Sequence, residues 1–163
     1  MIIAIDGPSA SGKSTTAKGV SKVLKILYID TGAMYRALTY GFVKEMVDLN
    51  NSREIKKYLS NVSINFNNEN EICLNNRCLL LEIRSKNITS KVSSVSAISS
   101  VRDKMVKLQR KIAEGRSCIL EGRDIGTVVF PKAKYKFFMR AELKDRAERR
   151  MLDYKRNGEH ISI

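Results

Sequence analysis

The alternation of strand-like and helix-like segments along the chain predicts an α/β fold with a parallel sheet. Residues 1–5 form a short apolar run, typical of a strand buried on both faces, and residues 26–29 form another. Each run is followed by a segment with apolar residues at helical spacing, at 15–24 and 33–46. Strand–helix–strand–helix order implies parallel strands joined by right-handed crossovers.

The segment between the first strand and the first helix matches the phosphate-binding pattern G-x-x-x-x-G-K-[ST]. It comprises Gly7, Pro8, Ser9, Ala10, Ser11, Gly12, Lys13 and Ser14, followed by Thr15. The flanking strand and helix argue against a glycine-rich turn that matches by chance. Lysine in such loops reaches the β- and γ-phosphates and the hydroxyl ligates Mg²⁺, which indicates these roles for Lys13 and Ser14. GTPases, ATPases and small-molecule kinases share the motif, so it leaves the phosphate acceptor open.

Residues 50–90 differ in character from the segments around them. They are rich in Asn and Ser, with alternating runs at 62–66 and 71–74 and turn-like pairs at 67–68 and 75–76. This pattern predicts a small antiparallel insert on the parallel scaffold. The alternative is a disordered, asparagine-rich loop.

A helix is expected over residues 90–113, with a break near Ser99 and Ser100 because serines weaken its first half. Gly115 is expected to end it. The next strand, 117–120, runs into Glu121-Gly122-Arg123-Asp124. Carboxyl ends of parallel strands form the ligand crevice, so this motif and Asp30-Thr31-Gly32 are expected to face the phosphate loop.

Two residues of that motif are candidates for substrate contacts. Arg123 suits a bidentate phosphate contact. Asp124 suits a hydrogen bond from an amino group or a hydroxyl, and its alternative role is a helix cap or a partner of Arg123.

The end of the chain reads as a strand at 134–139 and a helix at 142–156. The helix carries an arginine group, Arg146, Arg149, Arg150 and Arg156. It is interpreted either as a solvated charged helix or as a lid whose arginines neutralise charge during phosphoryl transfer.

Composition limits the function classes. A chain of 163 residues with 43% hydrophobic content is expected to form one domain with a real core. No apolar run approaches a membrane span and no basic segment precedes an apolar one at the start, so no membrane contact and no signal peptide are expected, and cytoplasmic localisation is the default. Cys73, Cys78 and Cys118 are interpreted as buried or half-buried thiols in a reducing compartment.

The net charge of +13 leaves two interpretations open, nucleic-acid binding or an anionic small-molecule substrate. The basic residues are scattered and no aromatic-rich RNA-binding signature accompanies them. A dedicated nucleic-acid role is therefore not favoured, although salt-sensitive binding to polyanions is expected.

Five segments carry a resemblance that covers essentially the whole chain. They are GPSASGKST, DTGAMYR, VRDKMVKLQR, EGRDIGTVVFP and RAERRMLDYKRNGE, of which TGAMYR and EGRDIGTVVFP are the most specific. With these motifs the chain resembles bacterial-type cytidylate (CMP) kinase. The resemblance implies transfer of the γ-phosphoryl group of ATP to CMP or dCMP with Mg²⁺. It also implies a three-layer P-loop NTPase sandwich, a monophosphate-binding insert and a monomer.

Carried over motif by motif, the resemblance assigns the ATP phosphate site to residues 7–15. The acceptor site that it implies consists of Thr31, Tyr35, Arg36, Ser93, Arg102, Arg123 and Asp124. The catalytic cations that it implies are Lys13, Arg36, Arg123 and Arg149. The domain divides into a core of 1–49 and 91–141, an insert of about 50–90 and a lid of about 142–163. The attacking oxygen belongs to a phosphate that is already anionic, so no general base is required.

The sequence departs from the family at its end. Family members are typically longer, with an R-D-x-x-D-x-x-R segment and a final strand and helix that help to hold the ribose and the phosphates. We therefore expect weak or no turnover from these 163 residues. Two alternatives to a CMP kinase stay open: a nucleotide-binding fragment without turnover, and a basic, nucleic-acid-associated P-loop protein.

Overall fold

The computed structural model describes residues 1–156, which form two compact units. The first unit contains Met1–Asp30 and the chain from Gly115 onward, and the second contains Thr31–Glu114. In chain order the elements are β1 (Ile2–Asp6), α1 (Lys13–Leu24), β2 (Leu27–Asp30), α2 (Thr31–Lys44), α3 (Ser52–Asn61), β3 (Ile64–Phe66), β4 (Ile72–Leu74), β5 (Arg77–Cys78), η1 (Glu82–Arg84), α4 (Lys86–Ala97), α5 (Ser99–Ala113), β6 (Cys118–Gly122), η2 (Ile125–Val129), β7 (Tyr135–Phe138) and α6 (Leu143–Arg156). None of the helices described over residues 1–156 is long and apolar enough to cross a membrane.

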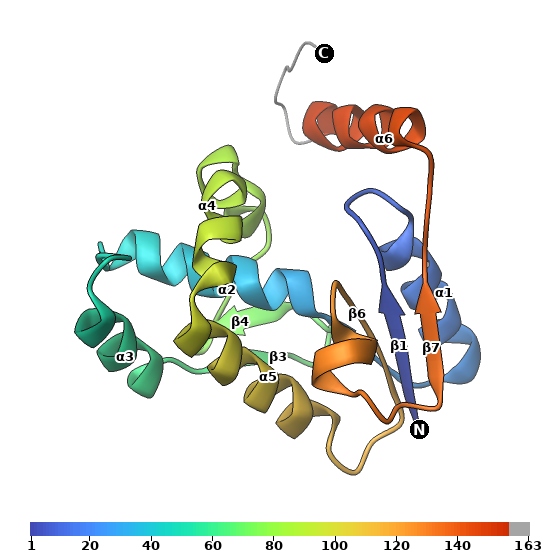
Figure 1. Ribbon diagram of the computed structural model, residues 1–163, viewed down its shortest axis with the longest axis horizontal. Coiled ribbons are helices and arrows are strands. Elements are labelled where there is room, and N and C mark those ends of the chain that lie inside the picture. The colour runs from blue at the N-terminus through green and yellow to red at the C-terminus, as the bar shows by residue number, and fades with distance from the viewer. Residues whose placement is uncertain (157–163) are drawn as a thin grey trace. The chain divides into compact units, whose positions relative to one another are not determined.

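The first unit contains the predicted parallel sheet, with the strand order β2-β6-β1-β7. All of its neighbouring strands are parallel, so their carboxyl ends meet at one edge. Figure 1 shows β1 and β7 side by side, pointing the same way, with α6 beyond their carboxyl ends. The predicted α/β class is confirmed.

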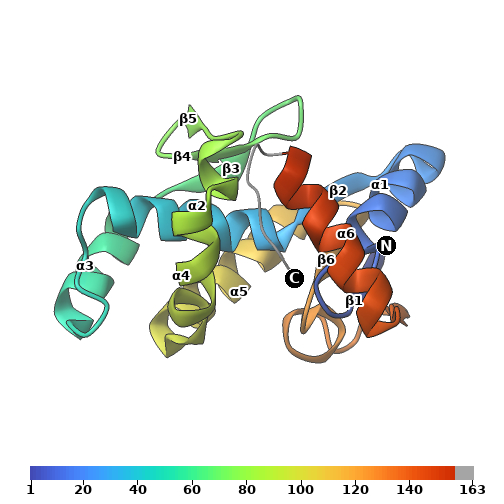
Figure 2. The ribbon, with the colours of Figure 1, turned by 90° about the horizontal axis from the view of Figure 1, so that it is seen from above.

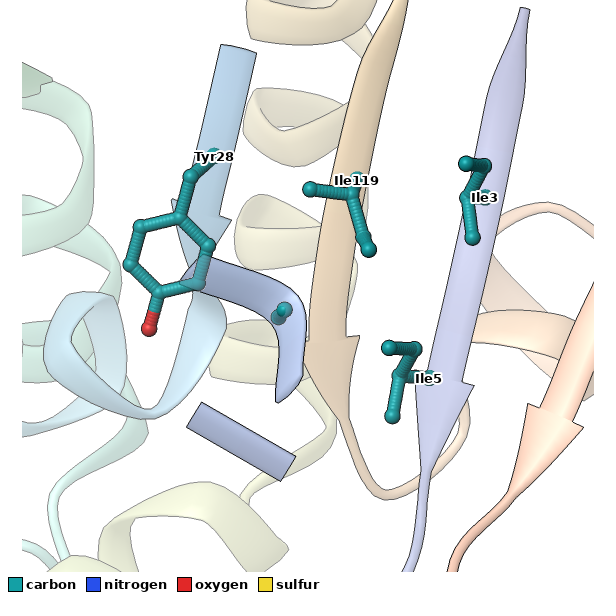
Figure 3. Close-up of a cluster of buried hydrophobic side chains, with 5 residues drawn as sticks. Ile3, Ile5, Tyr28 and Ile119 are labelled. Carbon is teal, nitrogen blue, oxygen red and sulfur yellow. The ribbon is translucent and has the colours of Figure 1, made fainter. Parts of the chain in front are cut away.

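One face of this sheet packs under α1. Ile3 and Ile5 of β1, Ile119 of β6 and Tyr28 of β2 form a buried cluster with Ala17 of α1 (Figure 3). Ile3 and Ile5 share a face because side chains alternate along a strand. Burial of each large aliphatic side chain stabilises the unit by about 1.5–3 kcal/mol.

The second unit is organised around α2. Its side chains Met34, Leu38 and Phe42 are buried, as the predicted helical stripe requires. The helix ends at Lys44, earlier than predicted, and Met46, the last position of the predicted stripe, is 88% exposed. The helix packs against α4 and η1 and against β4, and Figure 2 shows it between the small sheet and α4. The helix expected over residues 90–113 is broken into α4 and α5 at Ile98, which is extended, next to the predicted break.

The predicted antiparallel strands are confirmed, and they form a three-stranded sheet, β3-β4-β5. Asn75 and Asn76 have φ values of 48° and 64°, the left-handed conformation that tight hairpin turns require. Asn67 holds the other turn, because its Oδ1 accepts hydrogen bonds from the N–H groups of Glu69 and Glu71. The segment is therefore ordered by its asparagines rather than being a disordered loop.

Helix α3 was not expected from the sequence. Asn51 caps it by accepting hydrogen bonds from the N–H groups of Arg53 and Glu54, and Asn51 Nδ2 donates to the Glu54 carboxylate. Ile55 and Leu59, one turn apart, are buried. The N-x-x-E capping pattern before these apolar residues was the available signal.

The interpretation of all three cysteines as thiols is wrong for two of them. Cys73 of β4 lies directly opposite Cys78 of β5, and the two form a disulfide. The register of the hairpin causes this, because it brings two residues five apart in sequence face to face. Cys118 is a buried free thiol, and burial raises its pKa to about 11.

The predicted division into core, insert and lid stays a prediction. Helix α6 occupies the start of the proposed lid, and residues 157–163, the rest of it, lie outside the described residues.

Gly41 and Gly19 form a matched pair for a stability test, since both lie inside helices. A Cβ on Gly41 would overlap the Tyr58 hydroxyl, and Tyr58 packs edge-on against Phe42, whereas a Cβ on Gly19 meets nothing within 4 Å. Gly41→Ala should destabilise the protein by about 1–3 kcal/mol through overpacking. Gly19→Ala should stabilise it by about 0.5–1 kcal/mol through helix propensity. Urea unfolding measures both, and equal changes would contradict the packing around Gly41.

Candidate active site

The phosphate loop connects β1 to α1 in a conformation that its glycines make possible. Gly7 has φ +148° and a Cβ there would overlap the Met139 carbonyl, while Gly12 has φ +95°. Helix α1 begins directly afterwards, at Lys13, so its first N–H groups open onto the loop. The Ser11 hydroxyl is buried without a hydrogen-bond partner among the described residues. A phosphate chain bound in the curled loop would accept hydrogen bonds from the first N–H groups of α1 and from the Ser11 hydroxyl.

Four consecutive loop carbonyls each accept a hydrogen bond from a different cation. Arg123 donates to Gly7 O, Lys13 to Pro8 O at 2.6 Å, Arg146 to Ser9 O at 2.9 Å and Arg149 to Ala10 O at 3.3 Å. A cavity of about 1100 Å³ opens beside them, lined by loop residues, Arg123, Phe138, Arg140 and the α6 arginines. Arg146 and Arg149 therefore reach the loop, which favours the lid interpretation of α6 over a merely solvated helix.

Lys13 is the most buried of these cations, with 8% of its surface exposed. Burial lowers its pKa, the positive charge of Arg123 lowers it further, and Glu121 opposes the shift. A neutral carbonyl compensates a desolvated ammonium group poorly. An anion in the loop would compensate it far better.

Glu121 is a site residue to which the sequence analysis gave no role. It is buried near the carboxyl end of β6, in register with Asp30 of β2. One carboxylate oxygen accepts a hydrogen bond from Ser14 Oγ at 2.8 Å, and the other accepts one from the Tyr28 hydroxyl. Burial raises the pKa of Glu121, and the neighbouring Asp30 raises it further. The sequence pattern that could have indicated this residue is an acidic residue at the end of a strand adjacent to β1.

The oxygens at this point suit the predicted Mg²⁺. The Ser14 hydroxyl and the Glu121 carboxylate are hard donors of the kind that Mg²⁺ prefers. Residues 1–156 contain no cluster of three or more His, Cys, Asp or Glu side chains that could hold a metal by themselves. Mg²⁺ characteristically takes one or two protein oxygens and completes its shell with water and substrate phosphates.

Asp6 connects the phosphate loop to the EGRD motif. Its two carboxylate oxygens accept hydrogen bonds of 2.8 Å from the N–H groups of Ile125 and Gly126, and Gly7 follows it directly in the chain. A Cβ on Gly126 would crowd Asp6 and the Lys136 side chain. One buried carboxylate therefore holds the start of η2, a π-helical turn, and with it the position of Arg123 and Asp124. Within the described chain, the Asp124 side chain makes no hydrogen bond that caps η2, so the cap interpretation is wrong.

The other predicted acceptor residues lie in the second unit. They are Thr31, Tyr35 and Arg36 on α2, Ser93 on α4 and Arg102 on α5. Thr31 is buried, Tyr35, Arg36 and Arg102 are half-buried, and Ser93 is exposed. Helix α2 packs against both α4 and α5, so the three helices that carry these residues are mutual neighbours. Their roles stay predictions.

Glu121→Gln tests the electrostatics of the buried carboxylate. A carboxyl group whose folded-state pKa is raised contributes stability that is present below its ordinary pKa and is lost as pH rises through the folded-state pKa. The glutamine removes this loss, so the variant should gain stability relative to the parent chain between about pH 4 and pH 7.

Urea unfolding at both ends of that range measures the difference. Backbone hydrogen bonds lower the pKa of half-buried Glu82 below its ordinary value, so Glu82→Gln should lose stability relative to the parent chain as pH rises, with the change confined to below about pH 5. A Glu121→Gln difference that falls with rising pH would contradict the assignment.

Comparison with known proteins agrees with this site. A family model described as cytidylate kinase matches residues 3–163. The cytidylate kinase of Clostridioides difficile (strain 630) is 45% identical over 163 residues, which is 100% of this chain and 75% of that protein. The cytidylate kinase of Alkaliphilus oremlandii (strain OhILAs) is 48% identical over 161 residues, which is 99% of this chain and 74% of that protein.

A bifunctional pantoate ligase/cytidylate kinase of Prochlorococcus marinus (strain MIT 9312) is 48% identical over 158 residues, which is 94% of this chain and 31% of that protein. The chain thus spans about three quarters of the length of the cytidylate kinases and about a third of the bifunctional relative. Its parallel four-stranded sheet with flanking helices is the P-loop NTPase architecture that the motifs implied. The sequence match, the fold and the phosphate loop agree, and the chain belongs to the cytidylate kinase family.

Proposed function

We propose that this chain transfers the γ-phosphoryl group of ATP to CMP or dCMP. The observation that carries the proposal is the phosphate loop whose four consecutive carbonyls are met by Arg123, Lys13, Arg146 and Arg149. In a member of the cytidylate kinase family, such a cluster of cations is suited to the charge that spreads over a transferring phosphoryl group.

Phosphate oxygens would take the places that the loop carbonyls now occupy at these cations, those of the donor at Lys13, Arg146 and Arg149 and those of the acceptor at Arg123. Hydrogen bonds from arginine or lysine to phosphate oxygens join two opposite charges and are frequently bidentate for arginine, so they are stronger than those to neutral carbonyls. Arg146 and Arg149, on α6, would exchange Ser9 and Ala10 for phosphate oxygens. The loop N–H groups and Lys13 would hold the β- and γ-phosphates.

Ser14 would hold Mg²⁺, with Glu121 beside it. When bound, Mg²⁺ neutralises charge on the β- and γ-phosphate oxygens. The residues themselves orient the phosphates, exclude water from the loop and bring positive charge to it. Proton transfer by a side chain is not needed, because the acceptor phosphate is already ionised at neutral pH.

The acceptor residues carried over by motif are part of the proposal. In the first unit they are Arg123 for the acceptor phosphate and Asp124 for the exocyclic amine of cytosine. In the second unit they are Thr31, Tyr35, Arg36, Ser93 and Arg102. A carboxylate favours cytosine over uracil, because uracil would present a carbonyl to Asp124 and leave buried acceptors unpaired. A monomeric state and a cytoplasmic location also stay predictions.

A coupled ADP-release assay with ATP and Mg²⁺ tests the proposal against CMP, dCMP, UMP and AMP. For these 163 residues the expected CMP-stimulated turnover is weak, and Lys13→Ala should lower it by at least about 100-fold, since a charged group aimed at the transferring phosphate is lost. ATP binding without CMP-stimulated turnover would support a nucleotide-binding fragment instead. RNA binding that survives high salt would support a nucleic-acid role.

Asp124→Asn tests base selectivity. The amide replaces an acceptor by a donor on one side, so the variant should have a lower kcat/KM for CMP and a higher kcat/KM for UMP relative to CMP, with at least about a tenfold fall in the CMP-to-UMP ratio. Asp103→Asn, on the exposed face of α5, is the matched control and should keep the parent ratio. An unchanged ratio in Asp124→Asn would remove Asp124 from the base-reading set.

A further inference from the structure

The Tyr28 hydroxyl makes a buried contact that the proposed function does not use. It donates a hydrogen bond to one carboxylate oxygen of Glu121, and Ser14 Oγ donates to the other at 2.8 Å. We propose that Tyr28 is a positioning residue for metal binding: it holds Glu121 so that Ser14 presents its lone pairs to Mg²⁺. The inference rests on the ATP-binding half of the proposed function.

The sheet register brings these groups together. Tyr28 lies opposite Ile119, and Asp30 lies opposite Glu121, on the parallel strands β2 and β6. Residues two apart share a face, so Tyr28 and Glu121 lie on the same face and diagonally across the strand pair. Figure 3 shows the phenol oxygen directed along the course of the strands, toward the edge where Glu121 lies.

The Tyr28 ring has little freedom to turn away from Glu121. It packs in the buried cluster with Ile3, Ile5, Ala17 and Ile119. The Lys18 ammonium lies 5.8 Å from the ring centroid. Because packing and a cation hold the ring, its hydroxyl is a fixed donor to the Glu121 carboxylate.

The direction of the hydrogen bonds determines what Ser14 can do. A serine hydroxyl has one proton and two lone pairs. When the proton goes to Glu121, both lone pairs are directed away from the carboxylate and are available to a cation. An ionised carboxylate accepts only, so with Tyr28 on one oxygen, Glu121 keeps the other facing the exposed Ser14 side chain. Without the phenol donor the carboxylate loses one of the hydrogen bonds that orient it, and the acceptor of the serine proton is less well fixed.

Isothermal titration calorimetry with ATP, without CMP, tests the proposal in Mg²⁺ and in EDTA. The ratio of the two dissociation constants measures the contribution of the metal. Tyr28→Phe keeps the ring and removes only the hydroxyl, so affinity in EDTA should change by less than about twofold. The increase in ATP affinity that Mg²⁺ causes should fall by about tenfold, which is the lower end of the loss seen when a hydrogen-bond partner of a metal ligand is removed.

Two further variants guard against a purely structural effect. Tyr58→Phe removes the hydroxyl of a half-buried tyrosine in the second unit and should keep the parent ratio. Tyr28→Met fills the same apolar space without a hydroxyl and should reproduce the loss if the phenylalanine variant folds poorly. Circular dichroism and thermal melting check that each variant is folded.

A double-mutant cycle with Ser14→Ala identifies the route of the effect. If Tyr28 acts through Glu121 on Ser14, Tyr28→Phe should cause no further fall in the ratio once Ser14 is alanine. An additive fall, an unchanged ratio in folded Tyr28→Phe, or no gain from Mg²⁺ in the parent chain would overturn the proposal. Failure of CMP turnover with the Mg²⁺ gain intact would count against the proposed function alone.

Discussion

The parallel register of β2, β6 and β1 is the constraint on which the site depends. It ends all three strands at one edge, where Asp30, Glu121 and Asp6 lie in register or next to the phosphate loop. Three carboxylates at one sheet edge would repel one another in isolation. Hydrogen bonds to the two buried carboxylates offset this repulsion. Asp6 accepts from the N–H groups that start η2, and Glu121 accepts from two hydroxyls.

Four cations lie at the phosphate loop next to this acidic edge, and their positive charge accounts for the preference of the site for an anionic ligand. Arg123 and Lys13 are held at the loop with Arg146 and Arg149 of α6, each on a carbonyl oxygen. Neutral carbonyls do not balance these positive charges. Lys13 is also buried, and this burial lowers its pKa. A polyphosphate is the ligand that relieves this imbalance, which links the electrostatics of the unit to its family.

Local patterns predicted much of the fold but missed elements that depend on partners distant in sequence. The strand–loop–helix start, the parallel sheet, the break before α5 and the asparagine turns were all predicted, because each depends on propensities within a few residues. Helix α3 was missed because it lies in the asparagine-rich segment that was interpreted as strands and turns, and its cap went unrecognised. The Cys73–Cys78 disulfide depends on hairpin register, which composition alone does not reveal.

The sequence by itself determined the phosphate loop and the family, since a loop motif and its flanking elements are contiguous and their chemistry is carried by residue type and spacing. The tertiary structure alone decided the contacts of Tyr28, Asp6 and Glu121. Tyr28 and Glu121 are 93 residues apart, and Ser14 and Glu121 are 107 apart. Contacts of that range arise only when sheet order and register are established, because no local pattern specifies which strand lies beside which.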